Sequence, residues 1–159
     1  MKPLVAALLG VLGVGCAAPG WHAPAASVAA AVRVEVAQVM GRIASDLAAR
    51  GQQAWLEHFA VEPGFFMAAD GVMQLHDHAA AVAFLRDFAP SVADTQLTWS
   101  DLRIEPLSAD LAMVSAHYAE QLTTREGAAL KFAGHFTGVV WRTPRGWKIG
   151  HCHWSSPRP

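Results

Sequence analysis

The stretch that decides the fold lies near the end of the chain, residues 136–155, and reads FTGVVWRTPRGWKIGHCHWS. Two runs rich in β-branched and aromatic residues are separated there by Pro144-Arg145-Gly146. Such runs on either side of a proline- and glycine-containing turn are typical of paired strands. We therefore predict two antiparallel strands, over residues 130–143 and 147–155.

The residues that precede this stretch have a composition typical of strands as well. Residues 96–107 and 112–124 read as two long strands around Ser108-Ala109-Asp110. Together with the closing pair they predict a four-stranded antiparallel meander.

The first half of the domain is predicted to be helical. One helical stripe recurs at steps of three and four residues: Val28, Val32, Val36, Val39, Met40, Ile43 and Leu47. Ser27 is predicted to cap this helix. A second helix is expected over residues 52–59, and a third one is expected to begin after Asp77 and to end at Pro90. Between them, Asp70-Gly71 predicts a tight hairpin. Helices followed by long non-local strands indicate an α+β domain, with one sheet curled over the helices.

Composition sets limits on the function. The chain has 159 residues, 53% hydrophobic and 16% charged, which fits one folded domain with a core of its own. Its formal net charge is -1, and no basic stripe is present. Nucleic acid is therefore not expected as a partner.

The N-terminus reads as an export signal. Lys2 precedes an apolar run, residues 4–14, that is shorter than the ~20 residues of a membrane-spanning helix. Gly15-Cys16 follows, which resembles a bacterial lipoprotein signal, with Cys16 as the acylated residue. The predicted segments are a signal peptide over 1–16, a linker over 17–27 and a domain over 28–156. This predicts a periplasmic or cell-envelope lipoprotein that reaches the membrane only through its lipid anchor. Ordinary secretory cleavage near Ala17-Ala18 is the alternative.

Cys16 and Cys152 are the only cysteines. If Cys16 is acylated, Cys152 has no partner for a disulfide within the chain. In a strand, a lone Cys152 is expected to be a small core residue.

The chain resembles the nuclear transport factor 2-like superfamily, in its SnoaL-like and ketosteroid-isomerase-like bacterial branch. The resemblance rests on Arg50-Gly51 ahead of Trp55, on the Asp70-Gly71 hairpin, and on the closing pattern of residues 146–155. It implies a cone-shaped, curved, antiparallel to mixed sheet packed over three helices. It does not imply one function, because this fold hosts isomerases, cyclases, dehydratases and binding modules.

The resemblance also speaks against one activity. Steroid isomerases of this superfamily use a carboxylate base together with a Tyr/Asp pair that donates hydrogen bonds. The base position falls on or beside Ala68, and the donor Asp falls near Gly138. The first helix has no tyrosine, and Tyr118 lies on a predicted strand. Steroid isomerisation is therefore not expected.

Strand alternation suggests where the histidines lie. Counting by two along the last strand places Trp147, His151 and His153 on one face, which we expect to face the inside of the cone. A neutral imidazole can accept or donate a proton near pH 7, so His153 and His151, with Tyr118, are the catalytic candidates. A half-buried strand histidine is, however, often only a hydrogen-bonded structural residue. The predicted ligand pocket comprises Trp55, Phe59, Met67, Met73, Tyr118, His135, Trp147, His151 and His153.

The opposite sheet face would then be apolar. Phe136, Val140, Cys152 and Trp154 are predicted to lie on this outer face. Exposed apolar patches often form interfaces, so a homodimer is expected.

These features favour a small apolar or aromatic molecule as the partner of a binding module, with no cofactor. An isomerase, cyclase or dehydratase that uses the pocket histidines is the first alternative. A metal-binding variant is the second, because His76-x-His78 and His151-x-His153 each place two imidazoles on one side of an extended chain. No CxxC or HExxH motif accompanies these pairs, so no metal ligand is assigned.

Overall fold

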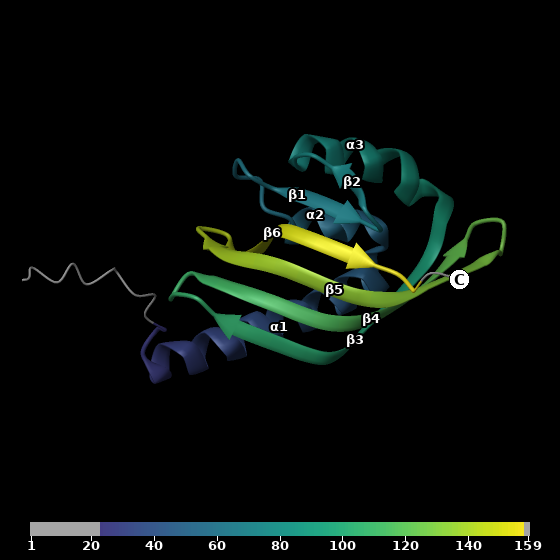
Figure 1. Ribbon diagram of the computed structural model, residues 1–159. Coiled ribbons are helices and arrows are strands. Elements are labelled where there is room, and N and C mark those ends of the chain that lie inside the picture. The colour runs from purple at the N-terminus through teal and green to yellow at the C-terminus, as the bar shows by residue number, and fades with distance from the viewer. Residues whose placement is uncertain (1–22, 158–159) are drawn as a thin grey trace, which may run out of the picture.

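The computed structural model describes residues 23–157 and places three helices against one curved sheet of six strands (Figure 1). The predicted α+β architecture is confirmed. The predicted signal peptide and residues 17–22 of the predicted linker lie outside the described residues, and the last two linker residues belong to the first helix. Among the described residues, no helix is long and apolar enough to span a membrane.

Helix α1 (Ala26–Arg50) is the longest helix and runs along the sheet (Figure 1). Its predicted stripe is buried from Val32 to Leu47, and Ala29 extends it by one turn. The predicted Ser27 cap is wrong: the helix begins at Ala26, two residues earlier than this cap implies, and its N-cap position, Ala25, offers no side-chain hydrogen bond. Gly51, at φ 71°, ends the helix in a backbone conformation that favours glycine.

Two shorter helical segments complete the helical layer. The chain passes through a 3₁₀ turn (η1, Gln52–Ala54) into α2 (Trp55–His58). Helix α3 (His78–Phe88) continues into a second 3₁₀ turn (η2, Ala89–Ser91). The predicted Asp77 cap is confirmed, because its carboxylate accepts a hydrogen bond from the Ala80 backbone N–H at 2.8 Å.

The sheet has the strand order β2-β1-β6-β5-β4-β3. The strands are β1 (Phe66–Ala69), β2 (Val72–Leu75), β3 (Val92–Pro106), β4 (Leu111–Thr124), β5 (Ala129–Thr143) and β6 (Gly146–Ser155). All neighbours pair antiparallel except β1 and β6, which are parallel, so the sheet is mixed. Asp70 and Gly71, at φ 48° and 86°, form the predicted tight turn between β1 and β2.

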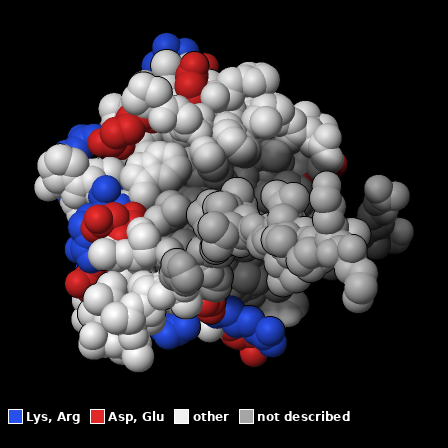
Figure 2. Space-filling model, turned by 60° about the vertical axis from the view of Figure 1, so that its left-hand side comes forward, with Lys and Arg blue, Asp and Glu red and all other residues white. Residues whose placement is uncertain are grey.

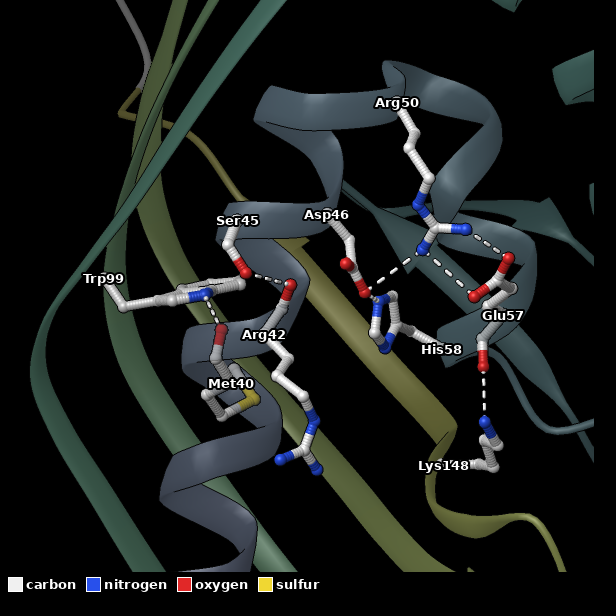
Figure 3. Close-up of polar contacts among 9 residues, drawn as sticks. All are labelled: Met40, Arg42, Ser45, Asp46, Arg50, Glu57, His58, Trp99 and Lys148. Atoms are coloured by element: carbon white, nitrogen blue, oxygen red, sulfur yellow. Dashed lines mark hydrogen bonds and ion pairs between the residues drawn. The ribbon is translucent and has the colours of Figure 1, made fainter.

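The core lies between α1 and the inner face of the sheet. The indole N–H of Trp99 on β3 donates to the backbone carbonyl of Met40 at 3.0 Å and ties the sheet to the helix (Figure 3). Inward from Trp99, Phe136 of β5 is fully buried. Its ring centroid lies 5.2 Å from that of Trp99 and 4.8 Å from that of Trp154.

In the middle of β6, the alternation of inward- and outward-facing side chains shifts by one residue. Val139 of β5 pairs with His151 and Val140 pairs with Ile149, so Gly150 has no partner and forms a β-bulge. Gly150 is required there, because a Cβ at this position would overlap the ring of Trp141. Before the bulge, Trp147 and Ile149 are buried; beyond it, Cys152 is buried while His153 is exposed.

The prediction of which side chains face inward is therefore wrong for β6 after Ile149, and it is also wrong for β5. His151 and His153 lie on the outer face of the sheet. Because Phe136 pairs with Trp154 and both lie in the aromatic core, His135 also points outward. The four residues expected to form an apolar outer face (Phe136, Val140, Cys152 and Trp154) instead face the core, so they supply no surface for the expected homodimer.

Candidate functional site

One cavity of about 270 Å³ opens where α2, α3 and the β1–β2 hairpin meet the inner face of the sheet. This volume is near the lower end of the range for ligand sites, roughly 300 Å³, and suits a molecule of one or two rings. The lining residues are Gln52, Trp55, Phe59, Met67, Ala69, Asp70, Leu75, Phe84, Leu85, Phe88, Tyr118, Glu120, Leu122, Phe132, Trp154 and Ser156.

Aromatic rings form most of the cavity wall. Trp55 begins α2 and Phe59 directly follows it, and their rings stack with centroids 5.4 Å apart. The ring of Trp154 meets those of Trp55 and Tyr118 edge-on, at 5.8 Å and 4.7 Å. Edge-to-face and offset contacts of this kind fix ring positions, so this part of the wall is rigid.

A short polar chain enters this wall from the side of η1. The amide nitrogen of Gln52 donates to Glu120 Oε1 at 2.9 Å and to Thr95 Oγ1 at 3.2 Å. Burial raises the pKa of Glu120, and the hydrogen bond from Gln52 lowers it by a smaller amount. The cavity therefore holds one carboxyl group that can change its protonation state more easily than a solvated glutamate near neutral pH.

The end of β6 closes one side of the cavity. The Ser156 backbone N–H donates to the Asp70 carboxylate at 2.7 Å, and the Ser156 hydroxyl lies 3.3 Å from the Tyr118 hydroxyl. These contacts join the β1–β2 turn to the centre of β4. The Tyr118 hydroxyl is thereby held at the cavity wall, where it can donate to a ligand.

Four of the nine residues predicted for the pocket lie together at this cavity: Trp55, Phe59, Met67 and Tyr118. Met73 is 43% exposed on β2. Trp147 is buried elsewhere, where its indole N–H donates to Glu35 at 2.7 Å. His135, His151 and His153 lie on the outer face, so Tyr118 is the one catalytic candidate that reaches the cavity.

The outer-face histidines have protein contacts of their own. His135 Nε2 lies 2.8 Å from the Ser115 hydroxyl, and its ring meets that of His117 at 4.8 Å. His151 stacks on Phe66 at 4.3 Å. Within residues 23–157, no three His, Cys, Asp or Glu side chains are grouped closely enough to hold a metal ion.

Neither Ala68 nor Gly138 lines the cavity, although Met67 and Ala69, the neighbours of Ala68, do. Ala68 pairs with His153 and is not among the lining residues. Gly138 faces inward, but a Cβ there would lie 2.7 Å from the ring of Phe136, so no larger side chain fits without a shift.

Sequence reasoning did not identify Glu120 and Gln52 as site residues. Glu120 shares a strand face with Tyr118 and interrupts a run of inward apolar residues that continues at Leu122, which was the available signal. The sequence pattern around Gln52 does not predict its burial, because Gln52 is buried through its position in the 3₁₀ turn η1.

A second polar cluster lies between α1, α2 and β6 (Figure 3). Asp46 contacts His58 at 2.8 Å and Arg50 at 3.2 Å, and Lys148 donates to the Glu57 carbonyl at 2.6 Å. Burial lowers the pKa of His58, and the hydrogen bond to Asp46 partly offsets this effect. None of these residues lines the cavity, so the cluster holds the helices together.

Cys152 is buried in the core, as expected. Burial raises the pKa of its thiol to about 12, which keeps it protonated and unreactive at neutral pH.

Surface charge is mixed. On the face in Figure 2, Lys and Arg groups lie beside Asp and Glu groups, with wide uncharged areas between them. Several charged side chains of the molecule are paired, including Arg142 with both Glu35 and Asp110.

Comparison with known proteins supports the fold. A family model described as "SnoaL-like domain" matches residues 36–159. No curated protein sequence matches the chain. A solved nuclear transport factor 2-like superfamily protein from Salmonella enterica superposes with a TM-score of 0.68 at 16% identity. The superposition covers 82% of this chain and 94% of the Salmonella protein.

Two other solved structures are named for elimination reactions. A candidate scytalone dehydratase from Novosphingobium aromaticivorans has a TM-score of 0.66 at 13% identity, covering 78% of this chain and 83% of its own. A type 2 hexachlorocyclohexane dehydrochlorinase (LinA) has a TM-score of 0.61 at 15% identity, covering 78% and 84%. At these identities the likeness shows a shared fold.

Proposed function

Because the chain belongs to the SnoaL-like family, we propose that it binds a small, mostly apolar molecule of one or two rings in the cavity under its sheet. The observation that carries this proposal is the cavity itself, which is walled by aromatic rings and contains a small number of polar groups. Binding sites for small molecules have this composition. A ligand hydroxyl or amino group facing Glu120 and Tyr118 would orient the bound ring.

Filling the cavity should abolish binding. Ala69 lines it, so Ala69→Phe is expected to weaken the binding of 2-phenylethanol at least tenfold by occupying its space. Affinity can be measured by isothermal titration calorimetry. Ala68→Phe is the matched control: it places the same side chain one residue away on β1, outside the lining, and should leave affinity within about twofold. Equal affinity in all three proteins would contradict the proposal.

A proton-transfer enzyme is the second candidate, favoured by the raised pKa of Glu120. A buried carboxylate of this kind can take a proton from a carbon next to a carbonyl, while Tyr118 donates to the oxygen that gains charge. Two structural neighbours are named as a dehydratase and a dehydrochlorinase, and elimination of water or HCl also requires the loss of a proton from the substrate. The test is exchange of the α-hydrogens of cyclohexanone in heavy water. Exchange that is no faster with the protein than with Glu120→Gln would contradict this candidate.

Export and lipid anchoring remain part of the proposal. The predicted signal and Cys16 precede the described residues, so their support is the sequence pattern alone. Expressed with its leader in a diderm bacterium, the mature chain should begin at Cys16 and carry acyl chains, which intact-mass spectrometry detects. Cys16→Ser should leave an unacylated chain. An unmodified mature N-terminus near Ala17 or Ala18 in the unsubstituted protein would instead indicate ordinary secretory cleavage.

A further inference from the structure

The charged side chains that line the cavity are all acidic. Of its lining residues, Asp70 and Glu120 carry carboxylates, and none is Lys, Arg or His. The wall therefore offers an anionic ligand no counter-charge, and its electrostatic potential favours neutral or positively charged molecules.

Glu120 is the carboxylate that a ligand can engage. Its Oε1 accepts from Gln52, and the described residues give Oε2 no hydrogen-bond donor. Asp70, in contrast, lies at an exposed turn and already accepts from the Ser156 backbone N–H. Glu120 is half-buried, so its carboxylate has lost part of its hydration, and a cation brought beside Oε2 would compensate for that loss.

Aromatic rings surround this carboxyl group. Phe132 of β5 is the direct cross-strand partner of Glu120, and Tyr118 precedes it by two residues on the same face of β4. Phe84 and Phe88 of α3 line the same cavity and stack on each other at 5.3 Å. The faces of aromatic rings attract cations, and the attraction grows when the site excludes water.

We propose that the ligand of this cavity carries a protonated or quaternary amine, which pairs with Glu120 Oε2 and lies against the rings around it. This inference rests on the proposed function, since it names the chemical class of the same ligand. A neutral ring would fill the cavity, but only an ammonium group would also neutralise the half-buried charge of Glu120.

The other ionisable groups nearby are few. Tyr118 and Asp70 share the cavity wall with Glu120. Lys131 lies close along β5, but it pairs with Gln121 and points to the opposite face of the sheet from Phe132. The pH dependence of ammonium binding should therefore follow the protonation of Glu120: burial raises the pKa of this group, so affinity should fall as pH is lowered through that pKa.

Three probes of similar size test the inference: 2-phenylethylammonium, 2-phenylethanol and phenylacetate. We expect calorimetry at pH 7.5 and low salt to give at least tenfold tighter binding for the ammonium than for the alcohol, and the weakest binding for the carboxylate. Glu120→Gln keeps the side-chain shape and should remove the ammonium preference. Glu126→Gln makes the same change in the exposed β4–β5 turn and should retain it.

The outcomes separate the two proposals. Equal binding of ammonium and alcohol, or a preference that survives in Glu120→Gln, would overturn the inference while leaving the cavity a binding site. A preference lost in Asp70→Asn and kept in Glu120→Gln would overturn the role of Glu120. Absence of binding by all three probes would count against the proposed function as well. In the unsubstituted protein, ammonium affinity that does not fall when the pH is lowered from 8 to below the ordinary glutamate pKa of 4.5 would also overturn the inference, without relying on any variant.

Discussion

Replacing Phe136 with alanine is expected to lower the free energy of unfolding by about 3–5 kcal/mol, whereas His135→Ala, one residue earlier, should lower it by less than about 1 kcal/mol. Phe136 is 0% exposed and packs between the rings of Trp99 and Trp154. Its removal leaves a cavity that the neighbouring strands cannot close. His135 is exposed and gives up one surface hydrogen bond to Ser115.

Urea unfolding followed by circular dichroism at pH 7 measures both values, with equal m-values as the check that each variant unfolds in one step. Phe132→Ala is a second control, since this residue lies on the same strand and face but is 44% exposed. It should cost about 1 kcal/mol or less. If His135→Ala lowered the free energy of unfolding more than Phe136→Ala, then His135 rather than Phe136 would face the core.

The order and type of the elements could be predicted because local signals determine them. The predicted strand ends agree with the observed ones to within a few residues on β4, β5 and β6. The Asp70-Gly71 turn and the Asp77 cap depend on the chemistry of one or two residues, which does not change with tertiary context. Ser27 failed as a cap because alanines ahead of it extend the helix by themselves.

The sheet faces could not be predicted by counting. Side chains alternate with a period of two, so one unpaired residue reverses every face beyond it. Gly150 is that residue, and in the sequence a glycine within a strand is compatible with either a regular strand or a bulge. The bulge accounts for His151 and His153 alone. On β5 no irregularity interrupts the pairing with β4, and His135 lies outward because the apolar Phe136 and Val140 occupy the inner face.

The candidate site was predicted in part for a related reason. Trp55, Phe59, Met67 and Tyr118 are large residues on short apolar runs, and burial brings such residues together in most arrangements of this fold. Glu120 shares the inner face of β4 with Tyr118, but its hydrogen bond from Gln52 exists only because η1 brings Gln52 against it from far away in the sequence. A contact of that kind leaves no periodic trace, so it requires the three-dimensional structure.

Gly134→Ala is expected to have the second large effect on stability. Gly134 lies opposite Tyr118 on the inner face of β5, and the chain after β6 crosses directly over it. A Cβ at this position would overlap the Ser155 carbonyl oxygen, and Ser156 Cα would be 3.1 Å away. Both neighbours are backbone atoms, so they cannot swing aside as a flexible side chain would. We expect a loss of about 3 kcal/mol, at the upper end of the usual range for overpacking.

The same substitution should also weaken ligand binding, because the displaced segment closes the cavity. Moving Ser156 breaks its hydrogen bonds to Asp70 and Tyr118, which hold one side of the wall in place. The affinity for 2-phenylethanol in Gly134→Ala should therefore fall at temperatures where the variant is still folded, as calorimetry beside a thermal melt can establish. Gly41→Ala is the matched control: a Cβ at this position of α1 meets no atom within 4 Å, so it should stabilise the protein by about 1 kcal/mol and leave binding unchanged. Loss of stability with intact affinity in Gly134→Ala would show that the end of β6 supports the fold without forming the cavity wall.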